Sequence, residues 1–223
     1  MTIRTFLNRC LVRSVRGIRR LRRDREGVAI LEFALVGPAF FALLLAILNT
    51  ILIYLAQEGL ETATEGAARL LLTGEAQTLK AANGTVGMTA GDFKNAICNG
   101  ISGKDASGNS VTYPSTLPAM LTCANLTVNV TNSTSYNVTS TSAPVFTYNK
   151  NGIVTSTNTG YQTGSGTGGQ NKVVVLQLIY LWPTAIGPLG LDMSNQPDGN
   201  RMLVATAIFT TENYSCSAST SVC

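Results

Sequence analysis

Histidine is absent from the 223-residue chain, and its five cysteines follow no zinc-binding spacing. The commonest general base and a frequent metal ligand are therefore missing. No motif pairs a nucleophile with a base, and the glycine-rich stretch 163–169 lacks the Gly-Lys-Ser/Thr ending of a phosphate loop. The acidic residues of the later chain share no common spacing: Asp92, Asp105, Asp192, Asp198 and Glu212. We predict no enzymatic activity, no catalytic residue, no metal site and no cofactor.

Charge is absent between Glu32 and Glu58, so residues 33–57 form an uncharged run of 25 residues. As a helix this run would extend about 37 Å, against a hydrocarbon core of about 30 Å. The run is therefore long enough to cross a membrane with some tilt.

Acidic residues are scarce in the first 26 residues, which hold nine arginines and only Asp24 and Glu26. Residues 27–223 carry seven basic and ten acidic side chains, so the basic character belongs to the leader alone. A nucleic-acid partner would need a basic face on a folded domain, so none is expected. An arginine cluster beside an apolar helix instead predicts a cytoplasmic amino terminus, which places the rest of the chain outside the membrane.

Three kinds of targeting segment remain open. The apolar run is too long for a cleaved secretory signal, but it fits an uncleaved signal anchor. The leader also has the arginine-rich, amphipathic pattern of an organellar transit peptide. In the third interpretation the chain is cut after Gly27 and keeps its apolar helix, because Gly27-Val28 followed by Glu32-Phe33 looks like the site of prepilin-type peptidases.

Glu32 has a physical rationale of its own in the third interpretation. A charged side chain at membrane depth costs several kcal/mol unless it is paired or hydrated. Cutting after Gly27 would create an α-amine on Val28 that could pair with this carboxylate in a neighbouring subunit. If Glu32 lies only at the interfacial edge, that cost is small and no partner is needed.

Residues 27–69 resemble the TadE-like segment of tight-adherence (Tad, or Flp) pilus assembly systems. The likeness rests on Glu32-Phe33-Ala34-Leu35, Pro38 and Ala67-Ala68-Arg69, whereas Asn49 and Asn213 depart from the family pattern. It implies a minor pseudopilin of the bacterial inner membrane with a periplasmic carboxyl-terminal domain, to be found in the assembly platform or the pilus fibre. It also implies two kinds of partner, a prepilin-type peptidase and other pilins or pseudopilins. The competing function is an uncleaved, signal-anchored surface or periplasmic binding protein.

The apolar run predicts one helix over residues 28–73, with a kink after Pro38. Gly74 suits the end of this helix. Its later part carries an apolar stripe and a separate row of acids; the stripe is Leu60, Ala63, Ala67, Leu70 and Leu71, and the acids are Glu58, Glu61 and Glu65. The stripe is expected to face an outer domain.

The outer region predicts a pilin-like α+β fold, in which the long amino-terminal helix packs on a small antiparallel sheet. A short helix should begin after Thr89, which would cap it together with Asp92 three residues on, and should end at Gly100. Strands are predicted at 126–131, 172–182 and 201–211, and residues 75–91, 99–120 and 132–170 otherwise read as loops. Val174, Leu176, Leu178, Tyr180 and Trp182 form one apolar strand face that should pack on the long helix.

The chain is thus expected to comprise a leader at 1–27, a membrane-spanning and continuing helix at 28–73, and a periplasmic domain at 74–223. Four cysteines lie in the outer region, where an oxidising environment allows disulfides. We predict the pairs Cys98–Cys123 and Cys216–Cys223, although the other two pairings remain open.

Overall fold

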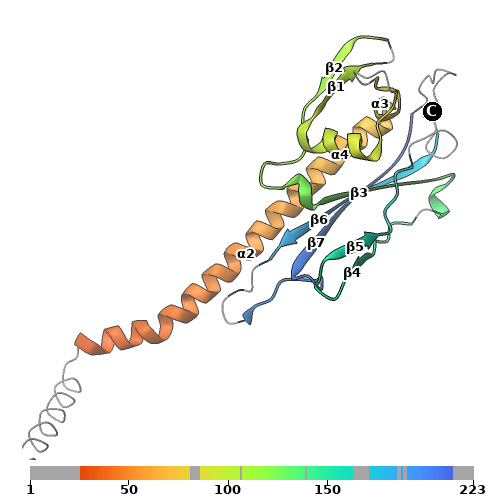
Figure 1. Cartoon of the computed structure of the whole chain (residues 1–223). Coiled ribbons are helices and arrows are strands. Elements are labelled where there is room, and N and C mark those ends of the chain that lie inside the picture. The colour runs from red at the N-terminus through yellow and green to blue at the C-terminus, as the bar shows by residue number, and fades with distance from the viewer. Residues whose placement is uncertain are drawn as a thin grey trace, which may run out of the picture. The chain divides into compact units, whose positions relative to one another are not determined.

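The structure is a computed structural model, and the chain has an α+β fold with one long helix and antiparallel sheets (Figure 1). It divides into two units that are described separately, residues 1–49 with 187–191 and residues 50–186 with 192–223. The backbone alone is described for residues 26–28 and 138. The described residues are 26–80, 86–105, 107–138, 140–162, 171–184, 187 and 190–212.

The long helix α2 runs from Glu26 to Leu72, close to the predicted 28–73, and contains Pro38. Its end is closed by backbone hydrogen bonds from Thr73 N to Arg69 O (3.0 Å) and from Gly74 N to Leu71 O (3.3 Å). Gly74 has a φ of 78°, a left-handed conformation that glycine adopts without steric cost. The predicted role of Gly74 at the end of the helix is confirmed.

The main sheet has the antiparallel order β3-β6-β7. Its strands are β3 (Leu126–Ser133), β6 (Val173–Pro183) and β7 (Asn200–Thr210), so all three predicted strands are present. Central strand β6 is buried on both faces from Val173 to Tyr180. Such double burial is typical of a central strand covered on two sides and explains its near-continuous apolar sequence.

The later part of α2 packs on one face of this sheet and forms the core of the second unit (Figure 1). As predicted, the helix contributes Leu60, Ala63, Ala67, Leu70 and Leu71, all buried. The facing side chains of β6 are Val174, Leu176, Leu178 and Tyr180, which are buried, and Trp182, which is half-buried. Burying each large apolar side chain contributes roughly 1.5 to 3 kcal/mol.

Helix α4 (Ala90–Asn99) confirms the predicted short helix. Thr89 accepts a hydrogen bond from Asp92 N (3.2 Å), and the Asp92 carboxylate accepts one from Thr89 N (3.1 Å), which completes a capping box. Phe93, Ala96 and Ile97 form the buried face.

Several short elements were missed by the sequence analysis. Two antiparallel hairpins lie in predicted loops, β1 (Ile101–Lys104) with β2 (Ser110–Tyr113) and β4 (Phe146–Tyr148) with β5 (Val154–Thr157). The loop predictions over 99–120 and 132–170 were therefore wrong in part, because three- and four-residue strands are too short to show an apolar alternation. The remaining short helices are α3 (Glu75–Thr78), η1 (Cys123–Asn125) and η2 (Tyr136–Val138).

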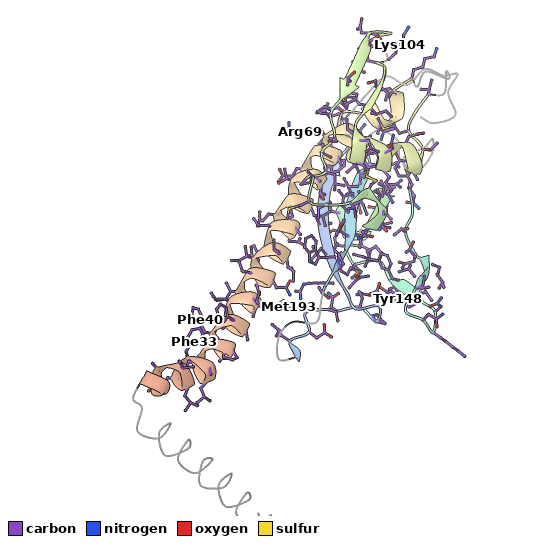
Figure 2. The ribbon with its side chains drawn as sticks, turned by 60° about the vertical axis from the view of Figure 1, so that its left-hand side comes forward. Phe33, Phe40, Arg69, Lys104, Tyr148 and Met193 are labelled. Carbon is purple, nitrogen blue, oxygen red and sulfur yellow. A yellow bond between two sulfur atoms is a disulfide. The ribbon has the colours of Figure 1, made fainter. Side chains whose placement is uncertain are left out.

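A disulfide joins Cys98 at the end of α4 to Cys123 at the start of η1, with the two Cα atoms 5.7 Å apart (Figure 2). It is one of the two pairs predicted from the sequence. The bond closes a segment with a sequence separation of 25, and closing a loop of that size stabilises the fold by about 3.5 kcal/mol in the chain-entropy account. Cys216 and Cys223, the other predicted pair, lie outside the described residues.

Candidate functional site: the amino-terminal junction of α2

The junction singled out by the sequence lies at the start of α2. Gly27 and Val28 belong to the helix backbone, and the leader up to residue 25 lies outside the described residues. Glu32 follows Val28 by four residues, about one helical turn. Its side chain is exposed and has no hydrogen-bond or ion-pair partner among the described residues. The carboxylate is therefore available to a group from outside this part of the chain.

Phe33 and Pro38 shape the next turns of the helix. A Cβ atom on Gly37 would lie 3.6 Å from two ring atoms of Phe33, so the ring rests against this glycine. Pro38 has no N–H, which removes the hydrogen bond that the Ala34 carbonyl would otherwise accept within the helix. Phe33 nevertheless remains 69% exposed and projects from the ribbon, as does Phe40 (Figure 2).

The first half of α2 presents an exposed apolar surface of unusual extent. Soluble monomers rarely expose apolar patches larger than a few hundred Å². The segment is also long and apolar enough to cross a membrane. Its exposed large side chains are Ile30, Leu31, Phe33, Leu35, Val36, Phe40, Phe41, Leu43, Leu44, Leu45, Ile47, Leu48, Ile51, Leu52, Tyr54 and Leu55.

The buried apolar side chains of α2 begin at Ile53 and continue at Ala56 and Leu60, which are 8%, 0% and 0% exposed. At the same level the Gln57 side chain makes two hydrogen bonds. Its Nε2 donates to the backbone carbonyl of Val204 in β7 (3.1 Å) and to Glu61 Oε1 (2.9 Å). The second unit therefore anchors the helix from this level onward.

At two glycines of α2, side chains from another segment approach the helix backbone closely, a feature that was not predicted from the sequence. A Cβ on Gly59 would lie 2.9 Å from Pro118 Cγ, and one on Gly66 would lie 2.6 Å from Thr116 Cγ2. Both contacts are too short for any residue larger than glycine without a shift. The available signal was the spacing of seven residues, which places both glycines on one side of a helix.

The perturbed titratable groups belong to the second unit. Hydrogen bonds from the backbone and side chain of Asn109 hold the pKa of Asp105 below its ordinary value. Burial lowers the pKa of Lys94, and burial together with a hydrogen bond to Glu75 raises that of Tyr113. Within the described ranges, no group of three or more His, Cys, Asp or Glu side chains lies close enough to hold a metal ion.

Comparison with known proteins places the junction in a family context. Residues 27–69 match a family model described as TadE-like protein. The match begins at Gly27 and ends at Arg69, in the last turn of α2, so the resemblance predicted from the sequence is confirmed over the same residues. Neither the curated proteins nor the solved structures include a match to this chain.

Proposed function

Residues 27–69 are a TadE-like segment, and from that premise we propose that the protein is a membrane-anchored minor pseudopilin required to assemble a tight-adherence (Flp) pilus. One observation carries the proposal. The family match starts at Gly27, the exposed apolar surface starts at Ile30, and the carboxylate of Glu32, two residues further on, has no partner among the described residues. A processing site, an anchor and an assembly contact thus coincide within a few residues.

The orientation follows from charge. Nine arginines in the first 26 residues stay in the cytoplasm, and the exposed apolar half of α2 spans the bacterial inner membrane once. The second unit then lies in the periplasm, an oxidising compartment in which the Cys98–Cys123 disulfide persists.

Processing creates the partner of Glu32. A prepilin-type peptidase cuts between Gly27 and Val28 and exposes the α-amine of Val28, close to the membrane surface. Glu32 of one subunit pairs with this amine on a neighbouring pilin or pseudopilin and so sets the axial register of the assembly. Phe33 and Pro38 shape the helix surface beside the pair. The protein acts through these contacts and not as an enzyme.

Intact-mass analysis of the protein isolated from its native membrane tests the processing step. A mass that starts at Val28 supports the pseudopilin. A mass that starts at Met1 or Thr2 supports the alternative function, an uncleaved anchored binding protein whose polar loops contact a ligand. An anchor alone also accounts for the exposed apolar half of α2, and this observation favours the alternative function.

Glu32→Gln tests the assembly contact. The variant should still be cut after Gly27 but should assemble pili poorly, because the amide cannot neutralise the new amine in a low-dielectric setting. Pilus yield and the mature mass are measured together. Glu58→Gln is the matched control, since this exposed acid lies beyond the apolar run and should leave both readouts unchanged. Normal piliation in Glu32→Gln would refute the pairing.

A further inference from the structure

Strand β7 forms one edge of the main sheet, and its outer backbone groups are only partly covered. The beginning of the strand is closed: Met202 N donates to Asn195 Oδ1 (2.7 Å), and Asn195 Nδ2 donates to Met202 O (3.4 Å). The carbonyl of Val204 accepts from Gln57. Alternate residues of a strand direct their backbone groups to the same side, so Thr206 and Ile208 direct theirs to this same outer edge.

The later part of this edge is open among the described residues. Neither Thr206 nor Ile208 has a described hydrogen-bond partner on its outer side, and both side chains are exposed, Ile208 by 43%. The opposite edge of the sheet differs, because Val130 N donates to Gly160 O (2.8 Å) and Gln162 N donates to Val130 O (3.0 Å). A short stretch of the chain itself thus covers β3, whereas the outer backbone groups of Thr206 and Ile208 in β7 have no partner among the described residues.

Acidic side chains of α2 border the open edge. Gln57 bonds to both Glu61 and Val204, which places Glu61 beside β7. At the other end of the strand, Glu212 N donates to Leu72 O (3.0 Å). Glu65 lies four residues after Glu61 and therefore on the same side of the helix. In the part of the chain that the structure describes, no cation lies within ion-pair distance of either acid.

We propose that the open edge of β7 binds an extended, basic segment of another protein by strand addition. The backbone of that segment would pair with Thr206 and Ile208, and its lysine or arginine side chains would face Glu61 and Glu65. The spacing agrees, since the four helical residues from Glu61 to Glu65 advance about 6 Å and two strand residues advance about 6.7 Å. A second copy of this chain fits less well, because pairing β7 with β7 would bring two acidic flanks together.

This surface belongs to the second unit, and it does not depend on the membrane anchor or on processing at Gly27. Failure of the proposed pilus function would leave it intact. The partner is a protein that presents alternate basic residues in an unpaired strand.

The test uses the full chain in detergent micelles and a synthetic heptapeptide that alternates lysine with valine. NMR amide exchange should show Thr206 and Ile208 exchanging rapidly in the free protein and protected when the peptide is added. Methylating the peptide nitrogens that face β7 should weaken binding roughly tenfold, because two backbone hydrogen bonds are lost. Salt should also weaken binding.

Variants of the protein separate the contribution of backbone hydrogen bonds to peptide binding from the contribution of charge. Thr206→Pro removes one outward N–H without touching the ladder to β6 and should abolish protection, whereas Thr206→Val keeps the N–H and should bind normally. Glu61→Gln combined with Glu65→Gln should weaken binding roughly two- to tenfold. The methylated peptide keeps the test valid if the proline variant does not fold.

Three results would overturn the proposal. Thr206 and Ile208 amides already protected in the free protein would mean that the chain covers its own edge. Equal binding of a peptide with glutamate in place of lysine would show that the edge does not select a basic partner. Self-association that Thr206→Pro abolishes would assign the edge to a second copy.

Discussion

The two halves of α2 contain similar large apolar side chains but differ in what covers them. Leu45 in the first half is 53% exposed, whereas Leu60 in the second half is fully buried. The second half interleaves alanines with leucines on one side and places Glu58, Glu61 and Glu65 on another, so a sheet can approach the small side chains while the acids remain in water. The first half has no charged face after Glu32 and needs an apolar medium around it.

The largest expected effect comes from truncating leucine in each half. Leu60→Ala leaves a cavity in the core and should lower the free energy of unfolding by about 2 to 5 kcal/mol. Leu45→Ala should change it little, since no protein core surrounds that side chain. Denaturant unfolding followed by the fluorescence of Trp182, the only tryptophan, measures both variants. An equal loss from the two would mean that the halves are not energetically distinct.

Adding a charged side chain should affect the first half of α2 and not the second, the reverse of the leucine truncations. Leu45→Arg should reduce membrane retention, because arginine near the centre of a spanning helix costs about 2.5 to 3.5 kcal/mol on insertion scales. Its Trp182 unfolding transition should stay unchanged. Thr62→Arg, at an exposed position of the second half, is the control and should retain the protein in the membrane. Release of both variants by an alkaline wash, or of neither, would contradict the assignment of the first half as the anchor.

Glycine substitution gives a smaller effect. Gly66→Ala should cost roughly 1 to 2 kcal/mol, because strain against Thr116 exceeds the gain in helix propensity. Gly37→Ala is the matched control in the first half, where the added methyl group would meet Phe33 at an ordinary 3.6 Å. Adding Thr116→Ser removes the clashing methyl and should restore the stability of Gly66→Ala. No rescue would mean that the two residues are not packed as described.

The smallest effect concerns Tyr113, whose pKa is raised from 10.0 by burial and then by Glu75. Because the folded-state pKa exceeds the unfolded value, its contribution to stability is present below pH 10 and is lost as the pH rises toward the folded-state pKa. Tyr113→Phe should remove this alkaline loss, as measured by unfolding from pH 9 to 11. The titration should be the same in detergent and in lipid, since Tyr113 belongs to the second unit. A pKa of Tyr113 that differs between detergent and lipid would contradict the independence of the second unit from the surrounding medium.

Much of the fold could be predicted because its signals are local. Thr89 and Asp92 are three residues apart, and the near-continuous apolar run of β6 lies within eleven residues, so a short window contains each pattern. The hairpins β1–β2 and β4–β5 could not be predicted from apolar alternation. Their signal was turn chemistry: Asp105 accepts from Asn109 N (2.8 Å), and Asn149 Oδ1 accepts from Asn151 N and Ile153 N (2.9 Å each).

The candidate site also combines features that could be predicted from the sequence with features that could not. The positions of Gly27, Glu32 and Pro38 relative to the apolar run follow from the residue order alone. The partner of Glu32 does not, because no described residue of the chain supplies it. The Gln57 contact with Val204 was also out of reach, since a sequence separation of 147 residues carries no local signal.

The sequence by itself determined that α2 is long, that residues 33–57 within it are free of charge, where α4 starts and ends, and which residues form the three main strands. Each of these depends on neighbours within a turn or along one strand. Only the tertiary structure decided that the buried apolar side chains of α2 start at Ile53 and that Gly59 and Gly66 receive Pro118 and Thr116. It also decided that β7 is an edge strand, whose Thr206 and Ile208 no described residue pairs. Burial and edge pairing depend on which segment, distant in the sequence, lies against a given face or edge. Only the folded structure brings such segments together.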